Sequence, residues 1–465
     1  MEEKKTYQKE YEFGFNDGNE YLLNEKKGLN KDIIRQISKL KEEPEWMLDL
    51  RLKAFDVFVK MENPKWGPDL SFINFDDYIY YSPSKKKMEN DWDKVPETIK
   101  NTFKKLGIPE AEAKFLNGVS TQYDSETVYK SLRKELEDQG VIFSNIETAL
   151  KLYPEIVKKY FGKLVSYADN KYAALNTSIW SGGSFIYIPN GVKVEKPLQA
   201  YFRINGLSLG QFERTLIILE SNALLHYVEG CTAPIYNENN LHAAVVEVFV
   251  GEDSSCRYTT IQNWSKNVLN LVTKRAKTLK RGNMSWIDGN IGSGINMKYP
   301  CTILEGDYST SDCISIAIAS KNVVQDSGAK MIHIGRDTKS KIISKSISLD
   351  GGDTRYRGLV EIKKNAINSF AHVECDTLIL DSISRSDTVP IEKIYNSESY
   401  LEHEAKISAI SDEQIFYFTS KGLTKKEAEY LIILGFIEPF VKELPMEYAI
   451  ELNRLIKLDM EGSVG

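Results

Sequence analysis

The stretch LKRGNMSWIDGNI, residues 279–291, joins a turn rich in glycine and polar residues to a short run of strand-forming residues. The same order of turn and strand returns in VGEDSSCRYTTIQ from Val250, LEGDYSTSDCISI from Leu304, IGRDTKSKIISKSI from Ile334 and LDGGDTRYRGLVEI from Leu349. In chain order the steps between the five starts are similar, except that the last one, from Ile334 to Leu349, is about half as long. Such a degenerate repeat is typical of stacked β coils.

The region around this stretch has the same character from about residue 164 to residue 410. Short alternating runs such as LHAAVVEVFV and CRYTTIQNW are rich in Val, Ile, Thr and Tyr, and no helical pattern alternates with them. We therefore predict a right-handed parallel β-helix, a β-solenoid, over residues 161–410 of a mainly β chain. A large β-sandwich is the main alternative.

The region before the solenoid, residues 1–160, is predicted to be a mainly helical N-terminal domain. The run EWMLDLRL, residues 45–52, has the apolar content of a packed helix. Val128, Leu132 and Leu136 recur at a spacing of four residues, which predicts a second helix.

The region after the solenoid, residues 411–465, is predicted to be a C-terminal helical domain. Ser411 with Gln414 and Thr424 with Glu427 fit the capping box, in which each side chain bonds the other residue's backbone N–H. Two helices are expected to begin there. The segment PMEYAIELNRLIKLDM predicts a third, with one broad apolar face.

Composition narrows the classes of function. The 465 residues carry a net charge of -6, so no basic excess is available for nucleic acid. The N-terminus has no apolar signal region, and YLIILGFI is too short to cross a bilayer of about 30 Å. We expect a cytoplasmic protein with neither nucleic acid nor membrane as a partner.

Cysteine usage agrees with a reducing compartment. The five cysteines have an odd total and no CxxC spacing, which disfavours both a disulfide framework and a zinc knuckle. Three of them receive no function from the sequence: Cys256, Cys301 and Cys313. Cys301 and Cys313 are expected to be core residues.

Motifs of energy coupling and hydrolysis are missing from the sequence. No GxxxxGK[ST], GxSxG or HExxH pattern occurs. We therefore expect no ATP hydrolysis by this chain and no enzyme activity of its own.

One candidate metal site combines Cys375 with the LEHEA run at 401–405. Thiolate and imidazole suit iron or an iron-sulfur cluster, and carboxylate is a harder, more labile ligand. In a regular strand His403 faces away from Glu402 and Glu404, so these side chains cannot all reach one iron unless the strand ends or twists. An ordinary polar edge is the alternative.

A second set of polar residues lies in the first half of the β region: Arg203, Asn205, His226, Cys231, Gln262, Trp264 and Lys280. Turn contacts and salt bridges are their ordinary roles. If they line the solenoid interior, they form a path for a small anion or a sulfur species, because an apolar interior does not tolerate unsatisfied donors. Arg203 or Lys280 would then stabilise Cys231 as a thiolate.

Several of these runs also carry a family resemblance. TQYDSETVYKSL, LNTSIWSGGSFIYIPNGV, HYVEGCTAP, GAKMIHI, CDTLILDSISRSDT and LPMEYAIELNRLIKLDMEGSVG resemble the SufB/SufD family, and within it SufB. SufB is the β-solenoid scaffold subunit of the SUF iron-sulfur cluster assembly system. The resemblance extends from about Asp76 to Gly465 without a large gap.

The resemblance implies partners and a transient cofactor. The C-terminal helices would dock an ABC-type ATPase, SufC, and the β-helix would pair with the paralogue SufD or with a second SufB copy. A cysteine desulfurase or its sulfur carrier would supply sulfur. An iron-sulfur cluster would form at the subunit interface and pass to acceptor proteins. The family complex is also linked to reduced flavin, for which this sequence shows no site.

The resemblance also implies roles for individual residues. Cys375 resembles the family's proposed cluster ligand, and Glu402, His403 and Glu404 match its acidic-histidine set near the interface. Cys231 resembles the proposed sulfur acceptor. Five residues would line the sulfur path: Arg203, Asn205, Gln262, Trp264 and Lys280. Some family members carry an N-terminal cysteine cluster, but this chain has no cysteine before Cys231.

Three other interpretations are open to test. SufD shares the solenoid and the docking helices, but the match at Cys375, the LEHEA run and the MEGSVG ending favour SufB. A β-helix polysaccharide lyase would cleave polysaccharide and would normally be secreted. A purely structural solenoid would form filaments, which helical caps at both ends oppose.

Overall fold

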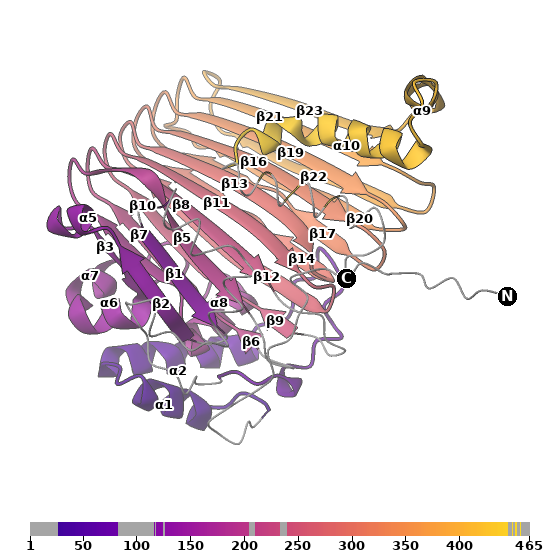
Figure 1. The fold of residues 1–465 in the computed structure, drawn as a ribbon. Helices are drawn as coiled ribbons and strands as arrows, with labels where there is room; N and C mark the ends of the chain where they lie inside the picture. The colour runs from indigo at the N-terminus through magenta and orange to yellow at the C-terminus, as the bar shows by residue number, and fades with distance from the viewer. Residues whose placement is uncertain are drawn as a thin grey trace.

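The computed structural model describes residues 27–81, 116, 118–123, 126–203, 210–232, 240–444, 449, 452 and 456. Two large β-sheets dominate it, and the chain passes repeatedly from one sheet to the other (Figure 1). The predicted mainly β solenoid with helices at both ends is confirmed. No helix among the described residues is both long enough and apolar enough to span a membrane.

The first sheet has ten strands within the described residues. From β5 to β23 all neighbouring strands are parallel, and β1 pairs with β5 in the same sense. In spatial order the strands are β2 (Glu126–Leu132), β1 (Gly118–Tyr123), β5 (Lys193–Arg203), β8 (Leu224–Thr232), β11 (Ser255–Trp264), β13 (Asn283–Gly292), β16 (Thr310–Ala319), β19 (Lys339–Ser348), β21 (Phe370–Ile379) and β23 (Tyr400–Ala409).

The second sheet faces the first and has more, shorter strands. Its main path runs β14 (Ile295–Lys298), β17 (Val324–Ser327), β20 (Asp353–Ile362), β18 (Lys330–His333), β15 (Cys301–Leu304), β12 (Val268–Thr278), β10 (Val245–Val250), β7 (Arg214–Leu219), β4 (Ser184–Ile188) and β3 (Ile142–Asn145). Off this path, β22 (Arg385–Ile394) pairs with β20, and β6 (Gly210–Gln211) pairs with β9 (Asn240–His242), which also pairs with β12.

The repeated turn sequences form the corners of the solenoid. Asp253, Arg281, Tyr308 and Asp337 all have left-handed backbone conformations, with φ between 53° and 61°. Each donates its N–H to a carbonyl one coil further on, at 2.9–3.0 Å. Asp350, in the fifth stretch, lies at the opposite corner between β19 and β20, which explains the short last step of the sequence repeat.

The coil length is set by the pairing of the long strands. Asn283 pairs with Thr310, and Leu224 pairs with Ser255. One coil therefore takes about 30 residues, as the sequence repeat predicts. Because strands stack in parallel register, side chains of equivalent position form rows along the solenoid.

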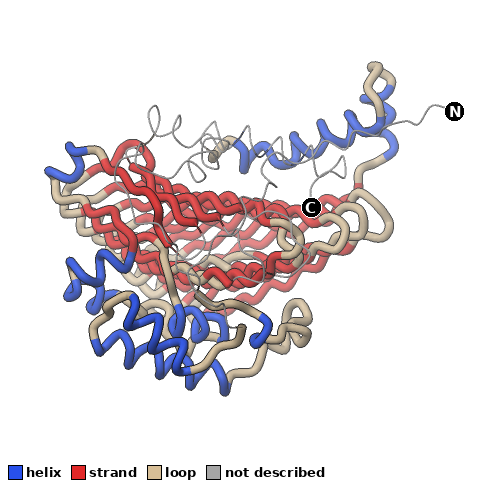
Figure 2. The backbone as a smooth tube through the Cα atoms, turned by 60° about the horizontal axis from the view of Figure 1, so that its bottom comes forward, coloured by secondary structure: helices blue, strands red, loops and turns tan. Residues whose placement is uncertain are grey.

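The described helices lie outside the two sheets, and some of them pack on an outer face. They are α1 (Lys31–Leu40), α2 (Glu45–Lys60), the 3₁₀ helix η1 (Phe75–Asp77), α5 (Lys134–Asp138), α6 (Ile146–Leu152), α7 (Pro154–Tyr160), α8 (Lys171–Ile179), α9 (Asp412–Thr419) and α10 (Lys425–Val441). Figure 2 shows the N-terminal helices and α10 on opposite sides of the strands. Ile433, Ile437 and Phe440 of α10 share an apolar cluster with Ile287 and Ile316 of the ten-stranded sheet.

The structure corrects one local prediction in the N-terminal region. Val128 and Leu132 belong to strand β2, and the helix that follows, α5, covers only Lys134–Asp138. Backbone pairing with β1 outweighs the four-residue spacing of apolar side chains. The predicted N-terminal domain is thus continuous with the solenoid, because β1 and β3 pair with β5 and β4.

The predicted C-terminal helices are confirmed where the structure describes them. Both capping boxes are formed, at Ser411 before α9 and at Thr424 before α10. Most of the third predicted helix lies outside the described residues. Leu452 and Ile456 are buried in the same apolar cluster as α10.

Candidate functional site

Cys375 and His403 meet inside the last coils of the solenoid. Cys375 lies on β21 and His403 on the neighbouring β23, where Val373 pairs with His403. The Cys375 Sγ lies 3.2 Å from His403 Nε2. The other ring nitrogen, Nδ1, lies 2.7 Å from Oε1 of Glu392, which comes from β22 of the facing sheet. A thiol, an imidazole and a carboxylate thus form one line of contacts across the coil.

These three groups have the chemistry of an iron site. Burial, together with Asp376 and Glu374, raises the pKa of the Cys375 thiol to about 11. The thiol is therefore protonated at neutral pH, and metal binding has to displace its proton. Among the described residues, no three His, Cys, Asp or Glu side chains converge tightly enough to hold a metal ion. The site is incomplete within this part of one chain.

Glu402 and Glu404 lie on the other face of β23. Glu402 contacts His372 at 3.4 Å, on the outside of the solenoid. Glu404 pairs in register with Glu374, whose side chain accepts a hydrogen bond from Lys345 at 2.6 Å. Strand β23 continues to Ala409, so it does not end in a way that would bring both faces together. The four predicted cluster ligands therefore do not converge within one chain.

The Cys375–His403 pair lies beside an exposed apolar edge. Strand β23 is the last of its sheet and β22 pairs only with β20, so this coil has no following coil among the described residues. Large side chains on it are exposed: Ile391, Ile394, Tyr400 and Ile407. Exposed apolar patches beside a functional group mark interaction surfaces.

The predicted sulfur acceptor lies inside the solenoid, several coils earlier. Cys231 is near the end of β8, with 2% of its surface exposed, and pairs in register with Gln262 of β11. Gln262 and Trp264 are also buried, which confirms their predicted interior position. The ring of His226 instead contacts Thr259 Oγ1 at 3.0 Å. It does not join the interior set.

The structure does not describe the side chains of two other residues of the predicted sulfur path, and the predicted interior position of a third is wrong. Asn205 lies outside the described residues, and Arg203 is described only by its backbone at the end of β5. Lys280 follows the end of β12 at Thr278, in an exposed corner beside Asp253. It does not line the interior. The strand stops before Lys280, so its side chain follows the corner rather than the strand alternation.

Two other lysines are buried in the interior, where Lys280 was predicted to lie. Lys274 of β12 and Lys298 of β14 lie 3.5 Å and 3.2 Å from Oδ1 of Asp288. Lys298 also donates to Oε1 of Gln262 at 3.0 Å. Burial lowers the pKa of Lys298 to about 8 despite Asp288. Burial would raise the pKa of Asp288, but the two lysines hold it below its usual value.

The interior also contains polar atoms without hydrogen bonds. Among the described residues, these include Nε2 of Gln262 and Nε1 of Trp264. Buried donors and acceptors are normally satisfied by protein or by ordered water. Their presence beside Cys231 indicates an interior that accommodates water or a small polar species.

The strand register connects the two cysteine regions through one inward row. Successive pairing places one residue of each strand in this row: Glu229, Thr260, Asp288, Ser315, Ser344 and Cys375. All six are buried. With strands about 4.8 Å apart, five steps span roughly 24 Å. Cys231 belongs to the adjacent inward row, on the same strand as Glu229.

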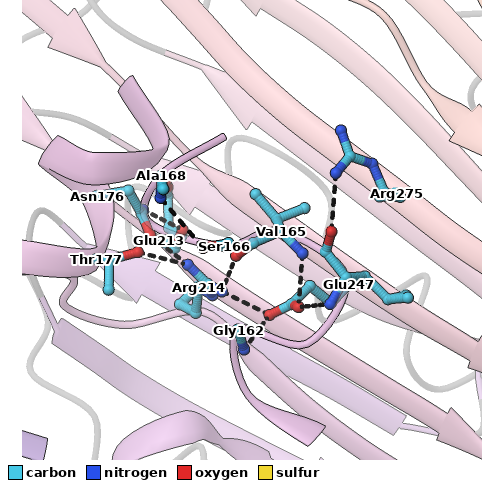
Figure 3. A network of polar contacts seen from close by, with 11 residues as sticks. Gly162, Val165, Ser166, Ala168, Asn176, Thr177, Glu213, Arg214, Glu247 and Arg275 are labelled. Atoms are coloured by element: carbon cyan, nitrogen blue, oxygen red, sulfur yellow. Dashed lines mark hydrogen bonds and ion pairs between the residues drawn. The ribbon is translucent and has the colours of Figure 1, made fainter. Parts of the chain in front are cut away.

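A separate buried network fixes the early coils (Figure 3). Arg214 Nη2 lies 2.5 Å from Oε2 of Glu247, and neither side chain is exposed. The Glu247 carboxylate also accepts the backbone N–H groups of Gly162, Leu164 and Val165 at 2.8–3.0 Å. This network holds the segment before α8 against β7 and β10. The residue before Arg214, Glu213, contacts His242 at 2.7 Å in the solenoid interior.

Comparisons with known proteins show the family of the chain. Residues 202–436 match the family model described as SUF system FeS cluster assembly, SufBD core domain, and residues 35–200 match the SufBD protein N-terminal region. Proteins of Staphylococcus aureus strains USA300 and NCTC 8325 and of Staphylococcus haemolyticus are described as iron-sulfur cluster assembly SufBD family proteins. Each is 55% identical over 456 residues, covering 98% of both chains. The chain belongs to the SufBD family of iron-sulfur cluster assembly proteins.

Proposed function

We propose that this chain is the scaffold subunit of a SUF complex, on which a labile iron-sulfur cluster is built and then passed to acceptor proteins. The contact between Cys375 Sγ and His403 Nε2 at 3.2 Å is the observation that carries this proposal. It joins a soft and a borderline ligand at an open end of the solenoid, next to Glu392. Family membership supplies the context.

The cluster would be completed by a second subunit. The incomplete ligand set and the exposed apolar edge of β22 and β23 support an interface there, with a SufD paralogue or with a second copy of this chain. Glu402 and Glu404 face outward on β23, so they would reach iron held between subunits rather than inside one. Shared ligation would also make the cluster easy to release.

Sulfur would enter at Cys231 and move along the polar interior toward Cys375. A cysteine desulfurase or its carrier would donate it as a persulfide. The buried cations Lys274 and Lys298 support this step, because they stabilise an anionic sulfur in a site that is otherwise closed to bulk solvent.

Energy would come from a partner ATPase of the ABC type, bound by the C-terminal helices. Helix α10 packs on the solenoid, while Phe416 and Tyr417 of α9 are 72% and 59% exposed. Two exposed aromatic side chains on one short helix fit a docking surface. The chain itself would act as a scaffold without enzymatic activity. We place it in the cytoplasm, since its five cysteines are free.

Within the family we propose the SufB role over the SufD role. Cys375, the LEHEA run and the MEGSVG ending all match SufB, and the Cys375–His403 contact gives the first two a common site.

The test is anaerobic cluster assembly on this chain, co-purified with its ATPase partner. Wild type, Cys375→Ser and Glu404→Ala are compared by visible absorption and Mössbauer spectroscopy. Cys313→Ser is the matched control, because Cys313 is another buried cysteine, two strands before Cys375 in the same sheet. We expect cluster loss in the first two variants with partner binding intact, and a normal cluster in the control. A full cluster yield in Cys375→Ser would contradict the proposal.

A further inference from the structure

The carboxylate of Glu229 faces the predicted sulfur acceptor inside the solenoid. Glu229 and Cys231 alternate on β8 and both point inward. The Cys231 thiol donates toward Oε1 of Glu229 with a sulfur-oxygen distance of 3.9 Å. The other oxygen, Oε2, accepts a hydrogen bond from the hydroxyl of Tyr258 on β11. This leaves Oε1 directed at the thiol and fixes the carboxylate in place.

The thiol needs such a neighbour. Burial, then Glu229 and Glu213, raise the pKa of Cys231 well above its ordinary value, although Lys274 and Lys298 oppose them. A sulfur nucleophile reacts as the thiolate, so a protonated buried thiol is inert. Because Cys231 is only 2% exposed, a neighbouring group of the protein is a closer acceptor for its proton than bulk water at neutral pH.

From this geometry we infer that Glu229 is the general base that takes the proton of Cys231 when sulfur arrives. This rests on the proposed function, because it assigns the proton transfer within the sulfur-accepting step. Glu229 is a catalytic residue in this account, since its oxygen contacts the reacting thiol.

The step balances without an oxidant or a reductant. Glu229 takes the proton from the Cys231 thiol, and the thiolate attacks the outer sulfur of an alkyl persulfide, R–S–SH. The new S–S bond forms on Cys231 as the S–S bond of the donor breaks. The leaving thiolate R–S⁻ takes the proton from Glu229, which gives R–SH and restores the carboxylate. The outer sulfur and its hydrogen remain on Cys231 as a persulfide.

The neighbouring charges favour both halves of this cycle. Lys274 and Lys298 lie on the facing sheet and stabilise the anionic sulfur while Glu229 is neutral. Among the described residues, the titratable groups that face Glu229 or the thiol are Tyr227, Tyr258, His242, Glu213, Lys274 and Lys298. Glu213 is held by His242, which leaves Glu229 as the carboxylate in contact with the sulfur.

The test is sulfur transfer from glutathione persulfide to the purified full chain, between pH 6 and pH 10. Persulfidation of the Cys231 peptide is quantified by mass spectrometry, which separates it from the other four cysteines. General-base catalysis is worth about 10²–10⁴ in rate, so we expect Glu229→Gln to react about a hundredfold more slowly at pH 7. The loss should shrink as the pH rises, because hydroxide then replaces the base. Glu229→Asp should restore part of the rate.

Matched variants separate this role from a structural one. Glu220→Gln makes the same chemical change just after the end of β7 and should leave the rate unchanged. Tyr258→Phe keeps the Glu229 carboxylate but removes the hydrogen bond that fixes it, so it should slow the reaction less than Glu229→Gln does. Reactivity of Cys256, buried on the neighbouring strand, reports any opening of the fold in the same samples.

Two outcomes would overturn the inference. One is an equal rate and an equal pH profile for wild type and Glu229→Gln. The other is a loss of rate that no rise in pH restores while Cys256 stays protected. Alkylation of Cys231 by iodoacetamide, measured over the same pH range, isolates the proton transfer from sulfur chemistry. If alkylation depends on Glu229 but no persulfide is transferred, Glu229 is the base and the sulfur-accepting function is refuted. If persulfide is transferred but neither reaction depends on Glu229, only the role of Glu229 as the base is refuted.

Discussion

The Arg214–Glu247 pair offers a sharp test of how the early coils are held. Glu247→Gln leaves the Arg214 guanidinium buried without a counter-charge and replaces one acceptor oxygen by an NH₂ group. Removing one partner of a buried ion pair costs about 3–5 kcal/mol, because the remaining charge stays desolvated. The three backbone N–H groups of Gly162, Leu164 and Val165 also lose a charged acceptor.

The reverse variant should cost less. Arg214→Met leaves the Glu247 carboxylate with its three backbone donors, and such a carboxylate remains well stabilised. We expect a loss of about 2 kcal/mol, from the hydrogen bonds that Arg214 makes to Thr177 and to the Val165 carbonyl. The double variant should cost less than the sum of the single ones, since it contains no unpaired arginine.

Hydrogen exchange measured by mass spectrometry is the appropriate assay. It reports the local opening of the segment around residues 162–165 and does not require the whole chain to unfold in two states. A loss of about 3 kcal/mol corresponds to exchange roughly 150-fold faster in this segment. Exchange in Glu247→Gln within a factor of about three of wild type, or faster exchange in Arg214→Met than in Glu247→Gln, would refute the reasoning.

Three further predictions concern acid stability, iron binding and partner docking. Burial lowers the pKa of His333 from 6.5 to about 4. Between these two pH values the imidazole is protonated in the unfolded chain but neutral in the folded chain. The free energy of unfolding should therefore fall by about 3 kcal/mol from pH 6.5 to pH 4. His333→Gln should flatten this part of the acid-unfolding curve, and an unchanged curve would argue against a neutral buried imidazole. Glu392→Gln should weaken iron binding by the isolated chain about tenfold, because Glu392 orients the His403 ring, whereas Glu404→Gln should not weaken it. Equal effects of the two variants in an iron titration would be inconsistent with an iron site at Cys375 and His403. Phe416→Ser should weaken binding of the partner ATPase at least about tenfold in calorimetry without lowering the melting temperature, and unaltered affinity would exclude α9 from the contact.

The solenoid was predictable because its signal is local and repeated. Several corners carry a left-handed residue, such as Asp253 or Tyr308, and the first half of β16 alternates between partly buried and buried residues. The hairpin β1–β2 was not predictable in the same way. Its spacing at Val128 and Leu132 also fits a helix, and only pairing with β5, which comes much later in the chain, decides the outcome.

The candidate site was predicted in part for a related reason. Cys375 and His403 stand out by residue type, and the strand alternation correctly separates His403 from Glu402 and Glu404. Glu392 and Glu229 could not be found, because glutamates are common and only the register of neighbouring coils shows what they face.

The lysine error has a specific cause. The segment around β12 holds several cations, and the resemblance alone did not show where the strand ends. Lys274 points inward within β12, whereas Lys280 lies beyond the last strand residue, Thr278. The predicted cation is therefore a lysine a few positions too far along the chain, in an exposed corner and not in the interior.

The most direct test of the central claim is whether His403 binds the iron of the assembled cluster together with Cys375. The complex is prepared with ¹⁵N-labelled histidine, the cluster is assembled anaerobically and reduced, and pulsed electron paramagnetic resonance is recorded. We predict a ¹⁵N coupling in wild type that is lost in His403→Ala and retained in His372→Ala, a nearby histidine on the outer face. A coupled cluster in His403→Ala, or no histidine coupling in wild type, would contradict an iron site at the meeting point of β21 and β23.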